Sequence, residues 1–301
     1  MKTEGHGRTA LITGASSGIG LELTRRLLSE GWQVIALNRS GFPEGDALLQ
    51  ASQGRKQLRV YRADLTDFDS LKLALGQLKA TEEKIDVLFN NAGGSFESLS
   101  FSKQGRELHF EVQTVVPYIL IMELKEHLRR GASKTVINTS SNVFRTTRRF
   151  DPDTLERPVA FKKLFGPYST TKLAMTLWTR ELAPQLAAEG IKLLGVDPGP
   201  NNTLRSGKTS GFPFYMKPLV RLFFPPPSRG ASRLYDAALG ASGIPSGAYV
   251  SNGKVAELGF AEQGRKVLEM VRAIHEREFV ARTNAHAVPD TLRGTDAGAR
   301  V

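Results

Sequence analysis

Cysteine is absent from this chain of 301 residues. Disulfides, thiolate nucleophiles and metal sites with cysteine ligands are therefore excluded. The chain also lacks any apolar run as long as a membrane-spanning helix, and residues 1–8 do not have the apolar character of a signal peptide. We therefore expect a cytoplasmic protein with no metal centre.

Acidic residues are too few to balance the basic ones, and the formal net charge is +11. An excess of this kind raises the question of nucleic-acid binding. The basic residues are scattered, however, apart from local groups at 145–149 and 162–163, and no recognisable nucleic-acid motif accompanies them. We expect no nucleic-acid partner and interpret the charge as a basic surface that attracts an anionic cofactor or an acidic membrane surface.

Residues 13–20, TGASSGIG, are the most informative segment that is present. They follow a short apolar run typical of a buried strand and precede a segment with apolar residues at helical spacing. Gly14 permits a tight turn, Gly18 lets the backbone approach a pyrophosphate, and Gly20 lets the helix pack closely on the strand. Because the start of a helix offers free N–H groups and a partial positive charge, the segment predicts a dinucleotide-phosphate cradle.

Apolar runs alternate with helical stretches along most of the chain. Strands that alternate with helices require right-handed parallel crossovers, which produce a doubly wound sheet with helices on both faces. The sequence therefore predicts an α/β fold, a single Rossmann domain over residues 1–280 with a mainly parallel seven-stranded sheet. The expected strands are 9–12, 33–37, 58–61, 85–89, 135–139, 191–196 and 248–251. The long expected helices are 168–189 and 106–130, and in the latter Pro117 either bends the helix or marks a loose turn.

Three segments depart from this alternation. Residues 142–166 form a long, basic, proline-containing connection, and residues 207–228 are rich in phenylalanine and proline. Since long connections in compact domains are commonly functional, we interpret 207–228 as a substrate lid. Residues 281–301 are polar and rich in alanine, threonine and arginine, which predicts a disordered tail.

Glycines and polar residues follow several of the predicted strands. Residues 90–93 (NNAG), 140–141 (SS) and 197–200 (DPGP) each come directly after a strand, and residues 168–172 (YSTTK) open the helix after the fifth. Ligands of a doubly wound sheet bind beyond the carboxyl ends of its strands. We therefore expect these segments to meet residues 13–20 at one crevice.

Taken together, these motifs resemble those of the short-chain dehydrogenase/reductase family, and the resemblance runs from about Arg8 to Phe279. The long interval between Ser141 and Tyr168, and the late segment SGAYV at 246–250, are closest in pattern to the retinol-dehydrogenase-like branch. The resemblance implies a Rossmann fold, a nicotinamide cofactor, hydride transfer to or from a carbonyl carbon, and a homo-oligomer formed through the two long helices.

The YxxxK pattern matches the catalytic pair of that family. Residues four apart lie on one face of a helix, so Lys172 can place its ammonium beside the Tyr168 hydroxyl. A nearby cation lowers the pKa of a phenol from its ordinary value of about 10, and Tyr168 can then act as general acid for carbonyl reduction and as base for the reverse. Ser141 would hydrogen-bond the substrate oxygen. Ser140 is the neighbouring candidate, and the resemblance favours Ser141.

Gln113 departs from the family pattern. Relatives usually carry an asparagine in the long helix, where it holds a water that relays protons to the lysine, and the corresponding position here is Gln113. Glutamine keeps the amide but places it one methylene further out, and such a displacement can reduce the catalytic rate. The departure puts the proton relay in doubt but not the hydride transfer, which the cofactor performs.

The residues after the second predicted strand indicate which nicotinamide cofactor is used. NAD-dependent relatives carry an acidic residue at the position of Asn38, where it binds the ribose hydroxyls and repels a 2′-phosphate. Here Asn38 is followed by Arg39 and Ser40, and a guanidinium suits a phosphate, so we expect NADP(H). With the contacts that the resemblance implies, the expected cofactor-binding residues are Gly14, Ser16, Ser17, Gly18, Ile19, Gly20, Asn38, Arg39, Ser40, Asp64, Leu65, Asn90, Ala92, Gly93, Tyr168, Lys172, Pro198, Gly199 and Thr203.

The composition of the lid bears on the substrate. Its apolar content favours a hydrophobic carbonyl or alcohol, although the same aromatic and basic residues also suit contact with a membrane surface or an oligomer interface. We expect an NADP(H)-dependent oxidoreductase, either a carbonyl reductase or an alcohol dehydrogenase. The alternative is a non-catalytic NADP(H)-sensing regulatory protein, which would have little reason to retain Ser141, Tyr168 and Lys172 together.

Overall fold

The structure, a computed structural model, describes residues 7–202, 204, 213–240 and 243–281. Thr203, the first part of the predicted lid (207–212) and the predicted tail from residue 282 lie outside the described residues, whereas Ala281 is still helical. Within the described ranges, no helix is long and apolar enough to cross a membrane.

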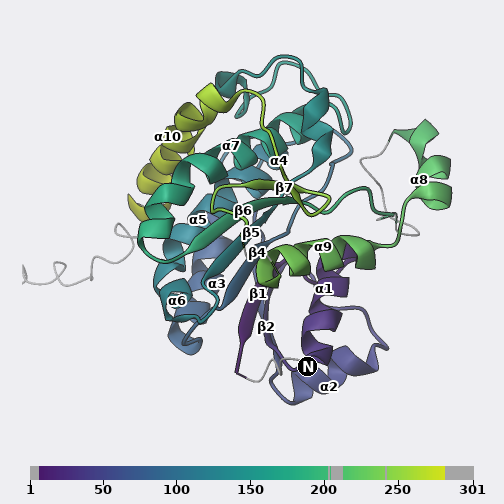
Figure 1. The fold of residues 1–301 in the computed structure, drawn as a ribbon, viewed down its shortest axis with the longest axis vertical. Coiled ribbons are helices and arrows are strands. Elements are labelled where there is room, and N and C mark those ends of the chain that lie inside the picture. The colour runs from purple at the N-terminus through teal and green to yellow at the C-terminus, as the bar shows by residue number, and fades with distance from the viewer. Residues whose placement is uncertain (1–6, 203, 205–212, 241–242, 282–301) are drawn as a thin grey trace, which may run out of the picture.

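A single sheet of eight strands runs through the middle of the molecule, in the order β3-β2-β1-β4-β5-β6-β7-β8 (Figure 1). Every neighbouring pair is parallel except β7 with β8. The predicted doubly wound α/β fold is therefore confirmed. The strands are β1 (Thr9–Thr13), β2 (Gln33–Asn38), β3 (Leu58–Arg62), β4 (Val87–Asn90), β5 (Thr135–Thr139), β6 (Lys192–Asp197), β7 (Tyr249–Ser251) and β8 (Lys254–Ala256).

The prediction of seven strands was wrong because it omitted β8, the hairpin partner of β7. Asn252 and Gly253 join the two strands with positive φ angles of 50° and 76°, as in a type I′ turn. The Asn-Gly dipeptide is a strong hairpin signal. However, β8 has only three residues and is largely exposed, so it carries no apolar run.

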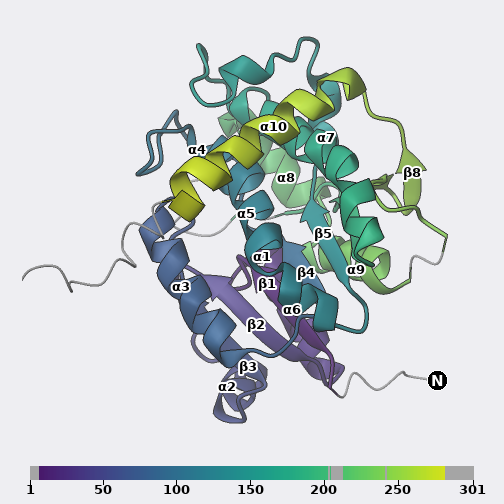
Figure 2. The same ribbon diagram turned by 90° about the vertical axis from the view of Figure 1, so that its left-hand side faces the viewer.

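Helices cover both faces of the sheet (Figures 1 and 2). The helices α1, α2 and α9 pack on one face, and α3, α4 to α7 and α10 on the other. The α-helices are α1 (Gly18–Ser29), α2 (Ala47–Gly54), α3 (Phe68–Thr81), α4 (Leu108–Phe110), α5 (Val116–Glu123), α6 (Lys125–Arg130), α7 (Pro167–Ala188), α8 (Lys217–Phe223), α9 (Pro227–Leu239) and α10 (Gly264–Ile274). The π-helical turns are η1 (Glu111–Val115) and η6 (His275–Val280), and the 3₁₀ turns are η2 (Asn142–Thr146), η3 (Pro152–Thr154), η4 (Phe214–Met216) and η5 (Ala261–Gln263).

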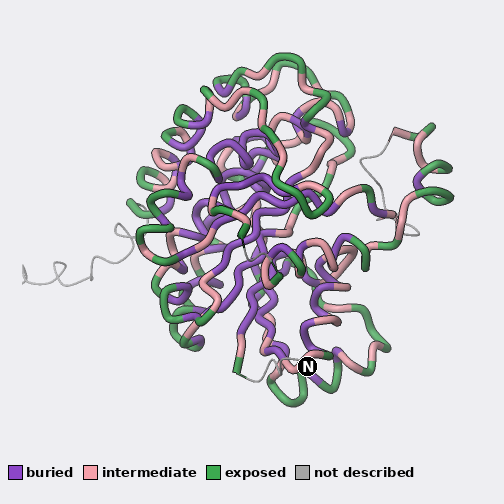
Figure 3. Tube along the Cα trace, in the orientation of Figure 1, coloured by how far each residue is buried: buried purple, intermediate pink, exposed green. Residues whose placement is uncertain are grey.

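The strands are continuous apolar runs because both faces of the sheet are buried. In β1, Ala10 and Ile12 pack in the same cluster as Leu23 of α1, whereas Leu11 joins the cluster on the opposite face. Figure 3 shows the buried chain running through the centre of the molecule. The core therefore forms one layer on each side of the sheet, and the loops beyond the strand ends are available to build a site.

The predicted helix 106–130 is divided in the structure. Helix α4 passes into the π-helical turn η1, α5 follows, and a break at Leu124 separates α5 from α6. Pro117 lies in the first turn of α5, where its missing N–H is tolerated, and it does not bend a continuous helix. A π-helical turn is frequently found at a functional site, and Gln113 lies inside η1.

The end of the predicted lid, residues 227–228, belongs to α9, which packs against α1, and the lid's function stays a prediction. Helix α9 begins at the last of three consecutive prolines, where a missing N–H costs nothing. The described part of the predicted lid therefore consists of η4, α8 and the prolines that lead into α9.

Candidate active site

Five neighbouring parallel strands end at one edge of the sheet. The last residues of β1, β2, β4, β5 and β6 are Thr13, Asn38, Asn90, Thr139 and Asp197. Because β2 and β4 lie on either side of β1, the chain switches direction across the sheet at this strand. Such a switch point is where doubly wound sheets bind their ligands. The segments singled out in the sequence meet at this edge.

The glycine turn between β1 and α1 has the geometry that its sequence predicts. Gly14 and Gly18 have positive φ angles of 66° and 54°, a region that glycine adopts without steric cost. A Cβ atom on Gly20 would lie 2.3 Å from the Gly14 carbonyl oxygen and 2.6 Å from Asn91 Nδ2. The turn is therefore so close to α1 that only glycine fits at position 20.

The side chains that end β2 and β1 tie the glycine turn and the NNAG loop to the strands. The Ala15 N–H donates to Asn38 Oδ1 at 2.7 Å, and Asn38 is buried. The Thr13 hydroxyl oxygen accepts from the N–H groups of Asn91 and Ala92 at 3.0 and 2.8 Å. These three hydrogen bonds join segments that are distant along the chain. For this reason sequence reasoning considered Asn38 only as a cofactor contact and missed Thr13.

Asn90 belongs to a buried network that crosses three elements. Its Nδ2 donates to Asn138 Oδ1 at 2.8 Å, and Asn138 Nδ2 donates to Thr179 Oγ1 of α7 at 2.8 Å. Asn90 Oδ1 is a buried atom of the described chain without a hydrogen-bond partner. The network joins β4, β5 and α7 and fixes the end of β4 at the edge where the other strands end.

Two guanidinium groups lie near the end of β2. Arg39 is 74% exposed, with its Nη1 atom 4.0 Å from the Asp64 carboxylate. Arg62 ends β3 and pairs in register with Asn38. A Cβ on Gly41 would lie 3.6 Å from Arg62 Nη2. Sequence reasoning predicted Arg39 and Asp64 as cofactor-binding residues but missed Arg62. The place of Arg62 beside Asn38 follows only from the pairing of β2 with β3.

The catalytic candidates Tyr168 and Lys172 lie on the first turns of α7. Lys172 is buried, its Nζ donates to the Thr139 carbonyl oxygen at 2.6 Å, and burial lowers its pKa to about 7. Burial also raises the pKa of Tyr168, a hydrogen bond with Ser141 opposes the rise, and the Asp197 carboxylate adds to it. The expectation that Lys172 lowers the pKa of Tyr168 is wrong for this arrangement, because the ammonium is directed to a backbone carbonyl and burial dominates.

The choice between the two serines after β5 follows from their partners. The Ser140 hydroxyl is buried and lies 2.6 Å from the Thr176 hydroxyl. Ser141 instead hydrogen-bonds Tyr168, and its Oγ accepts from the Val143 N–H at 3.3 Å. Ser141 is therefore the serine that faces the candidate proton donor.

Gln113 is directed at the NNAG loop. Its Nε2 donates to the Gly94 carbonyl oxygen at 2.8 Å, and a Cβ on Gly93 would lie 2.7 Å from Gln113 Cγ. The neighbouring Thr114 hydroxyl donates to the Thr171 carbonyl oxygen at 2.9 Å, which ties η1 to α7. Gln113 Oε1 is buried without a hydrogen-bond partner in the described chain. The Gln113 amide therefore holds the NNAG loop through Nε2 and leaves Oε1 for a water molecule. The role of Gln113 in a proton relay stays a prediction.

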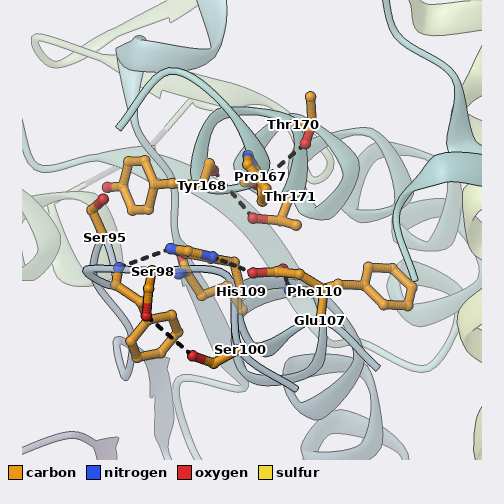
Figure 4. A network of polar contacts seen from close by, with 12 residues as sticks. Ser95, Ser98, Ser100, Glu107, His109, Phe110, Pro167, Tyr168, Thr170 and Thr171 are labelled. Atoms are coloured by element: carbon orange, nitrogen blue, oxygen red, sulfur yellow. Dashed lines mark hydrogen bonds and ion pairs between the residues drawn. The ribbon is translucent and has the colours of Figure 1, made fainter. Parts of the chain in front are cut away.

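A buried Glu–His pair lies beside Tyr168, and sequence reasoning missed it (Figure 4). His109 Nδ1 is 2.5 Å from Glu107 Oε1, and the Phe96 N–H donates to His109 Nε2 at 2.9 Å. Since Nε2 accepts, Nδ1 carries the proton and donates to Glu107. The His109 ring packs edge-on against the Tyr168 ring, with centroids 6.0 Å apart. The pair therefore links the loop after Gly93 to the face of the candidate proton donor.

The loop after β6 is tied to α9. Gly199 has a φ of 75°, and its N–H donates to Asp197 Oδ1 at 3.1 Å. Arg233 Nη1 donates to the Pro198 carbonyl oxygen at 3.2 Å, and a Cβ on Gly199 would lie 1.7 Å from that nitrogen. A larger residue at position 199 would displace this arginine. The predicted contact of Thr203 lies outside the described residues.

The other predicted cofactor residues are grouped around the same edge. Pro198 is buried, and Ser40 and Gly93 are exposed. The residues that are partly exposed are Ser16, Ser17, Ile19, Leu65 and Ala92.

Known proteins resemble this chain in sequence and in fold. Residues 8–150 match the sequence model of short chain dehydrogenases. The chain is 32% identical to retinol dehydrogenase 12 of Mus musculus over 64% of its own length and 61% of that protein. It is 30% identical to retinol dehydrogenase 11 of Homo sapiens over 77% of this chain and 73% of that one. A mutant short-chain dehydrogenase/reductase from Serratia marcescens has a similar fold, with a TM-score of 0.61 and 22% identity over 86% of this chain and 99% of that chain.

Proposed function

This chain belongs to the short-chain dehydrogenase/reductase family of oxidoreductases that use a nicotinamide cofactor, and from this premise we propose that it transfers a hydride between NADP(H) and the carbonyl or alcohol carbon of a hydrophobic substrate. The observation that carries the proposal is the position of Ser141, which is close enough to Tyr168 to lower its pKa, with the buried Lys172 one helical turn away. These groups share one edge of the sheet with the glycine turn. A proton donor and a phosphate-binding backbone therefore belong to one site.

The residues present fit a dinucleotide. The turn at residues 13–20 would hold the pyrophosphate through the N–H groups at the start of α1. Asn38 Nδ2 is a buried polar atom of the described chain without a hydrogen-bond partner, and it offers a donor beside the turn, because Asn38 Oδ1 accepts from the Ala15 N–H. When bound, the nicotinamide supplies or accepts the hydride.

The protein's own residues move the proton. Tyr168 donates its hydroxyl proton to the substrate oxygen during reduction and removes it during oxidation. Ser141 hydrogen-bonds the same oxygen and stabilises the charge that develops there. Because the pKa of Lys172 is about 7, its amine can gain or lose a proton near neutral pH one helical turn from Tyr168. Each carbonyl reduced consumes one hydride and one proton, and the reverse reaction releases both.

The preference for NADP(H) is supported by Arg39 and Arg62, whose guanidinium groups would both serve a 2′-phosphate. Asn38 carries no charge to repel the phosphate, and the nearest acidic group to Arg39 is Asp64 at 4.0 Å. A phosphate would compete with this weak ion pair for the exposed guanidinium, because charge-assisted bonds to phosphate are the stronger contact.

A comparison of the two cofactors tests this preference. Replacing both residues, Arg39→Ala with Arg62→Ala, should weaken NADPH binding about 10- to 100-fold, since bonds to charged groups contribute about 1.5–3 kcal/mol, and should change NADH binding little. Titration calorimetry with each cofactor gives the ratio. Arg129→Ala is the matched control, because Arg129 is exposed on α6 just before β5 begins, at the opposite edge of the sheet. An unchanged NADPH-to-NADH ratio would refute the assignment.

Turnover of a panel of substrates tests the activity. We expect the purified protein to oxidise NADPH with hydrophobic aldehydes or ketones, and the names of the relatives make retinaldehyde a suitable member of the panel. Tyr168→Phe should abolish turnover while NADPH binding persists. Tight NADPH binding without turnover of any compound would favour the alternative function, an NADP(H)-sensing regulator. A chain that binds no nicotinamide cofactor would overturn both.

A further inference from the structure

Helix α8 and the turn before it present an apolar surface to solvent. In Figure 1, α8 stands apart from the body of the molecule, between a segment outside the described residues and the start of α9. The exposed side chains, which we call the α8 face, lie within one stretch of ten residues and are between 55% and 82% exposed: Phe214, Tyr215, Leu219, Leu222 and Phe223.

The α8 face has a defined geometry. Leu219, Leu222 and Phe223 are spaced at i, i+3 and i+4, so they lie on one side of the helix. Val220, between them in the sequence, is buried. The rings of Phe214 and Tyr215 contact each other edge-on at 5.6 Å. Elsewhere in the described chain the exposed large apolar residues are separate positions such as Leu73 and Val159, which need no explanation.

The charge around the α8 face has one sign. Residues 198–235 contain no aspartate or glutamate, although acidic residues make up 30 of the 301 positions. The basic residues of this segment are Arg205, Lys208, Lys217, Arg221, Arg229 and Arg233. Lys217 and Arg221 lie on α8 itself, where Arg221 is exposed. Because an α-helix turns once in 3.6 residues, Lys217 and Arg221 lie on the side of α8 opposite its apolar residues, and the segment carries no acidic side chain to neutralise the cations.

We propose that the α8 face docks on a membrane surface that contains anionic lipid. A helix with an apolar side and with lysine and arginine on the opposite, polar side suits the boundary between headgroups and acyl chains, where aromatic rings also favour the interface. A second copy of this chain is a poorer match, because a symmetric contact would bring two cationic segments together. An anionic bilayer accepts both the apolar side chains and the cations. This inference does not depend on the proposed catalytic function.

Binding to vesicles tests the proposal with the full-length protein. We expect cosedimentation with phosphatidylcholine vesicles that contain phosphatidylserine, weaker binding to phosphatidylcholine alone, and a decrease at high salt. Leu222→Asp with Phe223→Asp should reduce binding at least about tenfold by removing apolar contact. Arg221→Glu should reduce it roughly 25-fold, since each unit of charge near an anionic surface contributes roughly a fivefold effect and the reversal changes the charge by two units. Leu73→Asp with Val159→Asp is the matched control and should bind as the natural chain does.

A fluorescent reporter gives a second readout. Both tryptophans, Trp32 and Trp178, are buried, so their emission should not respond to vesicles. Phe223→Trp should add a signal that shifts to the blue only with vesicles containing phosphatidylserine. Equal vesicle binding by the α8 and control variants would overturn the proposal. So would a dimer, seen by light scattering without lipid, that Leu222→Asp with Phe223→Asp dissolves. NADPH binding that persists in the α8 variant shows that its loss of vesicle binding is not a loss of fold.

Discussion

Lys172 is a residue whose burial makes stability depend on pH. Its pKa falls from 10.5 to about 7, so between these values the unfolded chain binds a proton that the folded protein does not. The free energy of unfolding therefore rises with pH across this window, and below pH 7 the burial costs up to about 5 kcal/mol.

Replacing the amine should remove this dependence. Lys172→Met should be more stable than the natural chain at about pH 6, and the difference should shrink as the pH rises toward 10.5, because the lysine in the folded protein is then neutral and the lysine in the unfolded chain is losing its proton. Urea unfolding of both proteins across that range, without cofactor, measures the difference. A gap in stability that does not change with pH would show that Lys172 is not titrating as its burial implies.

His109 is the second residue with a specific expectation, as a positioning residue that acts through Tyr168. His109→Leu removes the acceptor for the Phe96 N–H and the donor to Glu107, while leaving apolar contact with the Tyr168 ring. We expect kcat to fall about tenfold or more with little change in NADPH affinity, because a small displacement of a catalytic group is costly.

The matched control for this change is His127→Leu. His127 is also buried but lies on α6, whose end precedes β5 at the opposite edge of the sheet. The control should alter stability alone. If both variants lose kcat equally, or if His109→Leu alters only stability, the positioning role is wrong.

At the scale of the element, α1 depends on contact with the turn that precedes it. A Cβ at Gly20 would lie 2.3 Å from a backbone oxygen, whereas a Cβ at Gly76 of α3 would meet no atom within 4 Å. The two glycines therefore predict opposite outcomes for the same substitution.

We expect Gly20→Ala to abolish cofactor binding and to destabilise the protein, since backbone must shift. Gly76→Ala should instead stabilise it by roughly 0.5–1 kcal/mol, because alanine is the better helix former. Thermal unfolding and NADPH titration of the two variants provide the comparison. A Gly20→Ala variant that binds NADPH normally would show that the close approach of α1 to the turn is not needed.

At the scale of the molecule, cofactor binding should stabilise the whole domain. NADPH at about 100 times its Kd adds roughly 2.7 kcal/mol to the free energy of unfolding, which corresponds to a rise in Tm of about 5–10 °C for a domain of this size. Scanning fluorimetry with NADPH and NADH at the same concentration tests this expectation. Equal shifts would contradict the preference for NADP(H).

The parts of the site that could be predicted are those whose partners lie near in the chain. The positive φ angles of Gly14 and Gly18 and the helical spacing of Tyr168 and Lys172 are local properties, and sequence patterns report them directly. The apolar runs likewise predicted the sheet. The short exposed β8 was missed because three residues without apolar character carry almost no signal.

The sequence by itself therefore determined the class of fold, the glycine turn and the identity of the candidate proton donor. Tertiary structure decided where Lys172 directs its ammonium, which serine faces Tyr168 and that Arg62 lies beside the end of β2. It also decided that His109 lies against Tyr168. The physical reason is that hydrogen bonds, burial and pKa depend on which distant segments pack together. Strand pairing and helix packing set those distances, and no residue type or local spacing specifies them.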